Sequence, residues 1–172
     1  MLLWPDKSAS LLSIRPAQSG DDHFFQQLFA ATHSYFTNSG LPEPLAQQLL
    51  QQQYQLQQQS YQHQSPSPQI YLILLQQQPV GRLIMARHPD YLHITDLALL
   101  PAYCGQGLGS ELMTALQQYA QQQQLGLQLL VEQQNDGALQ FYLRHGFLRQ
   151  SKNGNHLQLC WPSIFVSDLV AG

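Results

Sequence analysis

The stretch that decides the fold is Pro101-Ala-Tyr-Cys-Gly-Gln-Gly-Leu-Gly-Ser110, which lies between an apolar run and a segment with helical spacing. Its glycines, Gly105, Gly107 and Gly109, stand at alternate positions. Residues without a Cβ atom let successive main-chain N–H groups turn toward one point, and the N-terminus of the following helix adds the positive end of its dipole. The pattern therefore predicts a loop that binds a phosphate group.

Two other kinds of phosphate-binding loop match this stretch only in part. A nucleoside triphosphate loop needs Lys and then Ser or Thr after its last glycine, whereas Gly109 is followed by Ser110 and Glu111. A dinucleotide loop that begins at Gly105 needs its third glycine where this chain has Ser110. Glu132 does stand near the end of the next strand, where such a loop needs an acid. A dinucleotide-dependent enzyme therefore stays open as one hypothesis.

A second motif follows at 131–147, with the sequence Val-Glu-Gln-Gln-Asn-Asp-Gly-Ala-Leu-Gln-Phe-Tyr-Leu-Arg-His-Gly-Phe. Together with the glycine loop it resembles the GNAT superfamily of acyl-coenzyme A dependent N-acetyltransferases. That family has an apolar strand, then Arg/Gln-x-x-Gly-x-Gly/Ala, and later Asn-x-x-Ala-x-x-Phe-Tyr-x-x-x-Gly-Phe. The resemblance covers residues 92–147 closely and the segment from Ile14 to Asp21 more loosely.

The resemblance implies which residues contact acetyl-CoA, the cosubstrate. Asn135 would contact the pantetheine arm or the next turn of its own helix. Tyr142 would stand beside the thioester sulfur, as the acid that protonates the departing thiolate. The pantetheine arm would be lined by the backbone of Leu97, Ala98 and Leu99, and the pyrophosphate would be wrapped by Cys104, Gly105, Gln106, Gly107, Leu108, Gly109 and Ser110.

Cys104 departs from the family pattern, which has Arg or Gln at that position. An Arg would add a charge-assisted contact to phosphate. Without it, the main-chain N–H groups and the helix end remain, and the dipole contributes about 0.3–2 kcal/mol. We therefore expect weakened but not abolished binding. A thiol near a helix N-terminus can also be reactive, and the alternative is that Cys104 is a small apolar filler.

Acyl transfer to nitrogen requires a neutral amine, so an amine that is protonated at pH 7 needs a base to remove its proton. At pH 7 an amine of pKa near 10.4 loses its proton at a cost of about 4.6 kcal/mol, and an α-amino group of pKa near 8 at about 1.4 kcal/mol. The chain offers few bases, because it has only ten Asp and Glu residues. Asp96 and Glu132 lie in or directly after apolar runs, where a carboxylate takes up protons more readily, and His93 is a third candidate.

Each of these residues also has a structural interpretation. Asp96 could pair with an Arg such as Arg82, and Glu132 could simply be exposed at a strand end. His93 could be a partly buried strand residue, and Tyr142 an aromatic residue of the core. The catalytic hypothesis is direct attack of the amine on the thioester, with the oxyanion held by a strand N–H such as that of Leu99.

Apolar spacing along the chain predicts an α/β fold with a mixed, mostly antiparallel sheet. We expect one domain over residues 1–172, with about seven strands and about four helices. The strands are expected near 11–15, 69–75, 80–87, 91–100, 125–131, 147–150 and 156–161, and the helices from 21, at 42–64, at 109–124 and at 135–145. The resemblance makes the helices of residues 21–64 the acceptor side and residues 91–147 the CoA-binding core.

Composition excludes several other classes. Only 10% of the residues are charged and 31 of 172 are Gln, so neutral amides hold positions where charges are usual. The net charge of −3 leaves no basic stripe for nucleic acid. There is no apolar stretch of membrane-spanning length, no signal-peptide core and no metal-binding motif. Two distant cysteines favour a reduced compartment, so we expect a cytoplasmic protein without a metal.

The sequence thus predicts an enzyme that transfers acetyl from acetyl-CoA to a primary amine of a small molecule, peptide or protein. The alternative is a module of the same fold that binds CoA as a sensor or docking surface without turnover, which Cys104 keeps open. Dimerisation is a tendency of the family, so the resemblance also allows a homodimer. Little charge also predicts little electrostatic steering of the acceptor.

Overall fold

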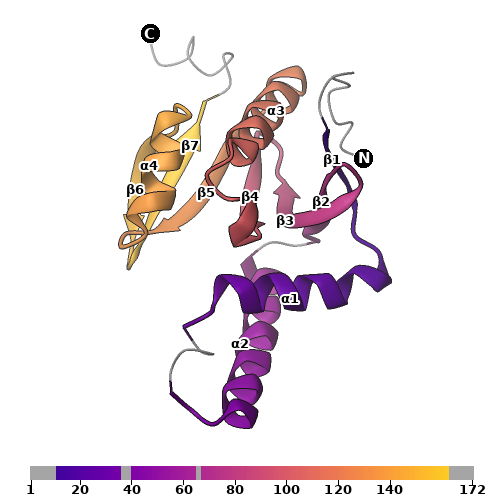
Figure 1. Ribbon diagram of the computed structural model, residues 1–172. Coiled ribbons are helices and arrows are strands. Elements are labelled where there is room, and N and C mark those ends of the chain that lie inside the picture. Colours follow the sequence, from indigo (N-terminus) through magenta and orange to yellow (C-terminus); the bar gives the residue numbers. More distant parts are fainter. Residues whose placement is uncertain (1–10, 36–39, 65–66, 163–172) are drawn as a thin grey trace, which may run out of the picture.

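The computed structural model describes residues 11–35, 40–64 and 67–162. These residues form one seven-stranded sheet in the order β1-β2-β3-β4-β5-β7-β6 (Figure 1). Neighbouring strands are antiparallel except β4 and β5, which are parallel. The strands are β1 (Leu12–Pro16), β2 (Gln69–Leu75), β3 (Gln78–Arg87), β4 (Tyr91–Leu99), β5 (Gly126–Glu132), β6 (Leu148–Asn153) and β7 (His156–Trp161).

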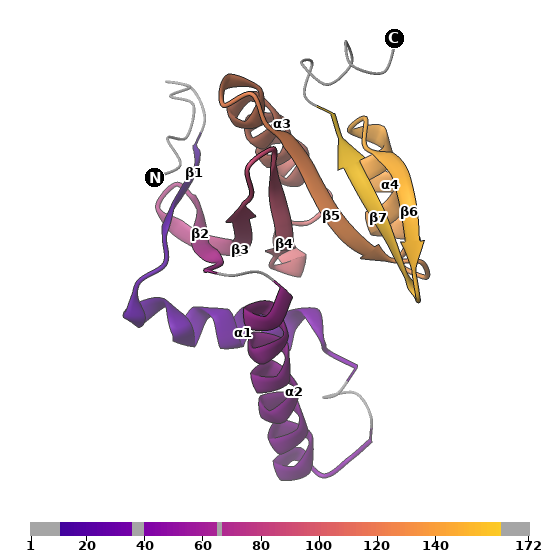
Figure 2. The same ribbon diagram turned by 180° about the vertical axis from the view of Figure 1, so that it is seen from behind.

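Four α-helices accompany the sheet in the described part of the chain: α1 (Asp22–Thr32), α2 (Glu43–Gln64), α3 (Leu108–Gln122) and α4 (Asp136–Arg144). Two short 3-10 turns, η1 (Ser19–Asp21) and η2 (Pro101–Tyr103), precede α1 and α3. Helices α3 and α4 lie over one face of the sheet, whereas α1 and α2 lie together at the lower end of the molecule in Figures 1 and 2. None of the helices in these ranges has the length and apolarity of a membrane span.

Strand alternation divides the buried side chains between the two faces. On β2, Tyr71 and Ile73 belong to the larger core cluster with α3, while Leu72 and Leu74 belong to a smaller cluster with Phe25, Phe29 and Tyr54 of α1 and α2. The run of apolar residues in β2 is continuous because both of its faces are covered. Most of the exposed side chains of α2 are glutamines.

The predicted α/β fold with a mostly antiparallel sheet is confirmed, and most boundaries differ from the expectation by one to three residues. The turn expected at 76–79 is confined to Gln76 and Gln77, whose φ values are +49° and +67°, so β3 already begins at Gln78. Such left-handed residues suit the tight turn of a hairpin. Strand β6 extends to Asn153 because it pairs along its length with β7. Its six residues are all exposed, so no apolar pattern marks the added part as a strand.

Candidate functional site

The glycine loop connects the end of β4, through η2, to the start of α3. Gly105 and Gly107 have φ of +75° and +85°, a left-handed conformation that a side chain disfavours. Gly107 is the N-cap of α3, and its carbonyl accepts the Glu111 N–H at 3.0 Å. Within the described residues, the main-chain N–H groups from Gly105 to Ser110 have no acceptor. They are therefore available to an anion at the positive end of the helix dipole.

The end of α4 is tied to this loop. His145 Nε2 lies 3.0 Å from Ser110 Oγ, and Gln117 of α3 donates to the His145 carbonyl at 2.6 Å. Burial, and then the charge of Arg144, lower the pKa of His145. This contact of His145 could not be predicted from the sequence, because no local pattern indicates that residues 35 apart in the chain meet.

Strands β4 and β5 run side by side for only part of their length. Their parallel pairing ends at Ile94 and Leu129, although β4 continues to Leu99 and β5 to Glu132. The register between β3 and β4 shifts at the same place, so that Thr95 is an extra residue in β4. A bulge of this kind bends its strand. Strands β4 and β5 are therefore separate along residues 95–99 of β4, before the chain reaches the glycine loop.

The separated part of β4 presents main-chain groups to the gap. Leu100 N–H donates to the Val80 carbonyl at 2.9 Å, and the next pair in register is Gly81 with Leu99. Hydrogen-bonded and non-hydrogen-bonded pairs alternate along an antiparallel ladder. The N–H groups of Leu99 and Leu97 therefore point away from β3, toward the side where pairing with β5 has ended.

Tyr142 is fixed on α4 by the way that helix ends. Phe147 N–H donates to the Tyr142 carbonyl at 3.1 Å and Gly146 N–H to the Leu143 carbonyl at 3.0 Å, which is the Schellman pattern. The Tyr142 and Phe147 rings pack edge to face at 5.4 Å. The Tyr-x-x-x-Gly-Phe spacing of the sequence therefore has a direct structural reason, which is to hold Tyr142 in a defined place.

The surroundings of Tyr142 keep its hydroxyl protonated. Burial, and then the negative charge of Asp96, raise its pKa well above the usual value. No other described residue is hydrogen-bonded to this hydroxyl, so it is free to donate to a ligand. The charge of Asp96, on β4, thus acts on a hydroxyl that comes from α4.

Asp96 pairs with Arg82, which is the structural interpretation that the sequence left open. Arg82 Nε and Nη2 donate to the same carboxylate oxygen, Oδ2, at 3.0 and 2.8 Å. Leu97 packs against the larger core, on the face of the sheet that α3 and α4 cover. Because successive side chains of a strand point to opposite faces, the neighbouring Asp96 points away from α3 and α4. The pairing does not exclude a role toward a ligand, since Oδ1 has no partner among the described residues and the Asp96 side chain is 20% exposed.

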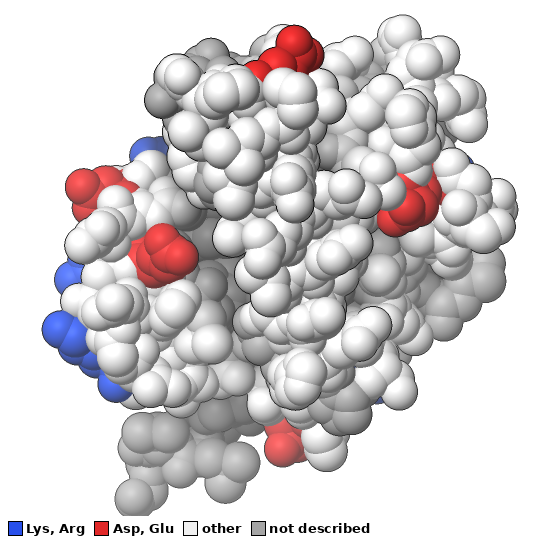
Figure 3. All heavy atoms as spheres, turned by 90° about the horizontal axis from the view of Figure 1, so that it is seen from below, with Lys and Arg blue, Asp and Glu red and all other residues white. Residues whose placement is uncertain are grey.

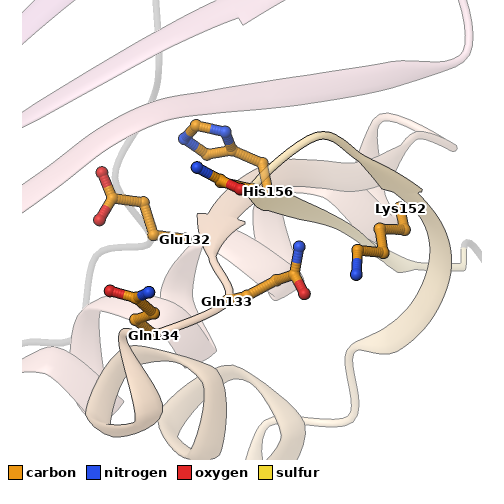
Figure 4. A pocket seen from close by; sticks show the side chains of 6 residues that line it. Glu132, Gln133, Gln134, Lys152 and His156 are labelled. Atoms are coloured by element: carbon orange, nitrogen blue, oxygen red, sulfur yellow. The ribbon is translucent and has the colours of Figure 1, made fainter.

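Glu132 lies at the end of β5, on the same sheet face as Asp96 by strand alternation, and is exposed. It is opposite His156 in register with β7. The two residues line a polar cavity of about 340 Å³, together with Gln133, Gln134, Lys152 and Asn155. In Figure 4, Glu132 and Lys152 lie at opposite ends of this cavity. Gln133 is held at the cavity by a hydrogen bond from its side chain to the Gly154 carbonyl at 2.8 Å.

Three further residues named from the sequence occupy different environments. Asn135 is the N-cap of α4, and its Oδ1 accepts the Ala138 N–H at 3.1 Å, so this oxygen contacts the next helical turn. Cys104 is exposed at the start of the glycine loop, with its Sγ 3.6 Å from the Leu100 carbonyl. His93 lies in the paired part of β4, before the bulge, where burial and the nearby His88 lower its pKa.

Comparison with known proteins identifies the family. The model of the acetyltransferase (GNAT) family matches residues 25–147, and the chain belongs to this family. No curated protein matches the chain. The family expected from the two motifs is thus confirmed.

Solved structures support the same fold. The PaiA N-acetyltransferase of Thermoplasma acidophilum in complex with coenzyme A is 15% identical, with a TM-score of 0.65 over 88% of this chain and 98% of that chain. An acetyltransferase of Thermus thermophilus is 23% identical, with a TM-score of 0.62 over 88% and 96%. A GNAT family acetyltransferase of Elizabethkingia anophelis with acetyl-CoA bound is 16% identical, with a TM-score of 0.58 over 88% and 97%.

Proposed function

We propose that this protein transfers the acetyl group of acetyl-CoA to a primary amine by direct attack. The observation that carries the proposal is that the free N–H groups of the glycine loop follow the last part of β4, residues 95–99, which is not paired with β5. Acetyl-CoA is a linear molecule with a pyrophosphate in its middle and an amide-containing arm that ends in the thioester. One ligand of this kind fits both features, and the CoA-bound relatives of the same fold support it.

The pyrophosphate binds along the N–H groups from Gly105 to Ser110. The pantetheine amides bind in the gap, where Leu97 and Leu99 present the N–H and C=O groups that β5 no longer pairs. A strand edge recognises an extended amide chain in the same way as it recognises a further strand. The Asn135 side-chain nitrogen lies at the start of α4 as a further contact, since its oxygen is used by the helix cap.

The reaction takes place between Tyr142 and Asp96. The amine nitrogen attacks the thioester carbonyl carbon, the nitrogen–carbon bond forms, and the oxyanion is stabilised by the Leu99 N–H. The proton lost by the nitrogen goes to the Asp96 carboxylate. When the carbon–sulfur bond breaks, Tyr142 gives its proton to the thiolate of CoA. Solvent then reprotonates Tyr142 and takes the proton from Asp96.

Glu132 is the second candidate base, because it lies on the same face of the sheet and lines the polar cavity. A base farther from the thioester can act through one water molecule. Replacing each carboxylate by its amide separates the two roles. If Glu132→Gln and Asp96→Asn both leave the pH profile of turnover unchanged, neither carboxylate is the base.

The acceptor is recognised by contact more than by long-range attraction. Figure 3 shows the end of the molecule that carries α1 and α2, where Lys, Arg, Asp and Glu occupy only small, scattered parts of the visible surface. Weak fields give little steering, so the KM of the acceptor is expected to depend little on salt. A small amine, a peptide and a protein amino group all stay within this proposal, as do the homodimer and the cytoplasmic location.

Two measurements test the proposed function. Calorimetric titration with acetyl-CoA, and with NAD as the control, tests the ligand of the glycine loop. Thiol release from acetyl-CoA across a panel of amines then tests transfer. Binding of acetyl-CoA together with amine-dependent thiol release supports the proposal. Binding without release on any amine would favour the CoA-binding module, and binding of NAD alone would favour a dinucleotide-dependent enzyme.

A further inference from the structure

Arg82 is a charged side chain in an unusual place. It lies in the middle of β3 and is only 3% exposed. A buried charge is costly unless it is paired and hydrogen-bonded. Arg82 meets this requirement through three partners, since Nη2 contacts Asp96, Gln57 and Tyr61, the last two from α2 at 3.1 and 3.3 Å.

Arg82 donates its hydrogen bonds to only one of the two carboxylate oxygens of Asp96. Both donors, Nε and Nη2, point at Oδ2. A paired fork would instead place one donor on each oxygen. The rotation of the carboxylate is thereby restricted while Oδ1 keeps its capacity to accept a hydrogen bond. Because the Asp96 side chain is 20% exposed and that of Arg82 only 4%, a ligand reaches Asp96 but not Arg82.

Aromatic rings of α1 and α2 also contact the guanidinium group of Arg82. The Arg82 carbon Cζ lies 5.4 Å from the centre of the Tyr61 ring and 5.7 Å from that of Phe25. These distances are in the range of cation–π contacts. Burial, and then the charge of Asp96, raise the pKa of the Tyr61 hydroxyl, which interacts with the Asp96 carboxylate as well as with Arg82, so it stays neutral beside the ion pair. Gln57 adds its Oε1 as a further acceptor.

We propose that Arg82 is a positioning residue which, held from α2 by Tyr61 and Gln57, fixes Oδ2 of Asp96 and presents Oδ1 to the attacking amine. The inference rests on the proposed function, because it assigns Arg82 to the same reaction. It connects the acceptor-side helix to the reacting carboxylate. A change in α2 therefore alters catalysis even though no atom of α2 takes part in it.

The test removes one hydroxyl group and compares two tyrosines of the same helix. Tyr61→Phe removes the contact to Arg82 and also a hydroxyl that interacts with Asp96, so Gln57→Leu, which changes a partner of Arg82 alone, must show the same effect. Tyr54→Phe is the matched control, because Tyr54 is exposed to the same 8% and its hydroxyl donates to a different carboxylate, Asp22, at 3.0 Å. Gln57→Leu is a second variant that weakens the support of Arg82 without changing a buried residue. Arg82 itself is left intact, because its replacement risks unfolding.

The kinetic constants for the best amine of the panel are measured together with the affinity for CoA. We expect Tyr61→Phe and Gln57→Leu to lower kcat by about tenfold, as misplacement of a catalytic group does. Their affinity for CoA should stay at the wild-type value, and Tyr54→Phe should leave both quantities unchanged. Equal kcat for Tyr61→Phe and Tyr54→Phe would overturn the positioning role while the proposed function stands. A wild-type protein inactive on every amine would overturn both.

Discussion

Replacing Gly107 by Ala tests the conformation of the glycine loop. With φ of +85°, Gly107 is in a region where a residue with a Cβ atom costs about 1–2 kcal/mol. A Cβ added there meets no heavy atom within 4 Å, so strain of the backbone is the only effect of the substitution. The strain lowers either the stability of the protein or its affinity for CoA, depending on whether the loop keeps its shape in the free protein.

If the free loop keeps its shape, the variant loses about 1–2 kcal/mol of stability, and its Tm falls by about 2–8 °C. If the free loop relaxes, stability is unchanged, and CoA must restore the strained conformation on binding. The affinity then falls by about 5–30-fold, because 1.4 kcal/mol corresponds to a factor of ten. We expect the second result, since Gly107 is exposed and nothing packs against it.

Gly20→Ala is the matched control for this experiment. Gly20 is also exposed, and a Cβ there also meets nothing within 4 Å, but its φ lies outside the left-handed region. We expect unchanged Tm and unchanged affinity for CoA. Calorimetric titration and thermal unfolding of the three proteins give both quantities. A Gly107→Ala protein with the Tm and the CoA affinity of wild type would refute the reasoning from the dihedral angle.

Three further predictions concern single side chains. Asp96→Ala leaves Arg82 buried without its ion-pair partner, so urea unfolding should show a loss of about 3–5 kcal/mol; a loss below about 1 kcal/mol would contradict the pairing. Hydrogen bonds from Arg15 lower the pKa of Asp21 in the folded protein. The ionised Asp21 therefore stabilises the fold above its unfolded-state pKa of about 3.9, and this stabilisation is lost as the pH falls through the folded-state pKa. Urea unfolding of Asp21→Asn should therefore depend less on pH in the acid range, and an unchanged dependence would remove that role. Tyr142→Phe should bind CoA like wild type but release thiol about 10²-fold more slowly; full turnover would remove the assigned acid role.

Much of the fold could be predicted from the sequence, because its signals are local. The alternation of apolar residues depends on neighbours within one strand, and the glycine loop depends on consecutive residues. The spacing from Tyr142 to Phe147 is local too, since the helix end that it encodes is closed by hydrogen bonds within six residues. The exposed extension of β6 was missed for the same reason, because pairing with β7 and not its own pattern makes it a strand.

The α/β fold, the glycine loop and the family motif can be read from local patterns in the sequence. Which side chains meet near the end of β4 depends on the tertiary structure. From the sequence, Asp96 could be a base or the partner of Arg82. The register of β3 with β4 brings the two side chains together, and the hydrogen bonds from Arg82 use only one oxygen of the carboxylate. The packing of α2 against the sheet brings Tyr61 within hydrogen-bonding distance of Arg82. These contacts join residues distant in the chain, so no local pattern encodes them.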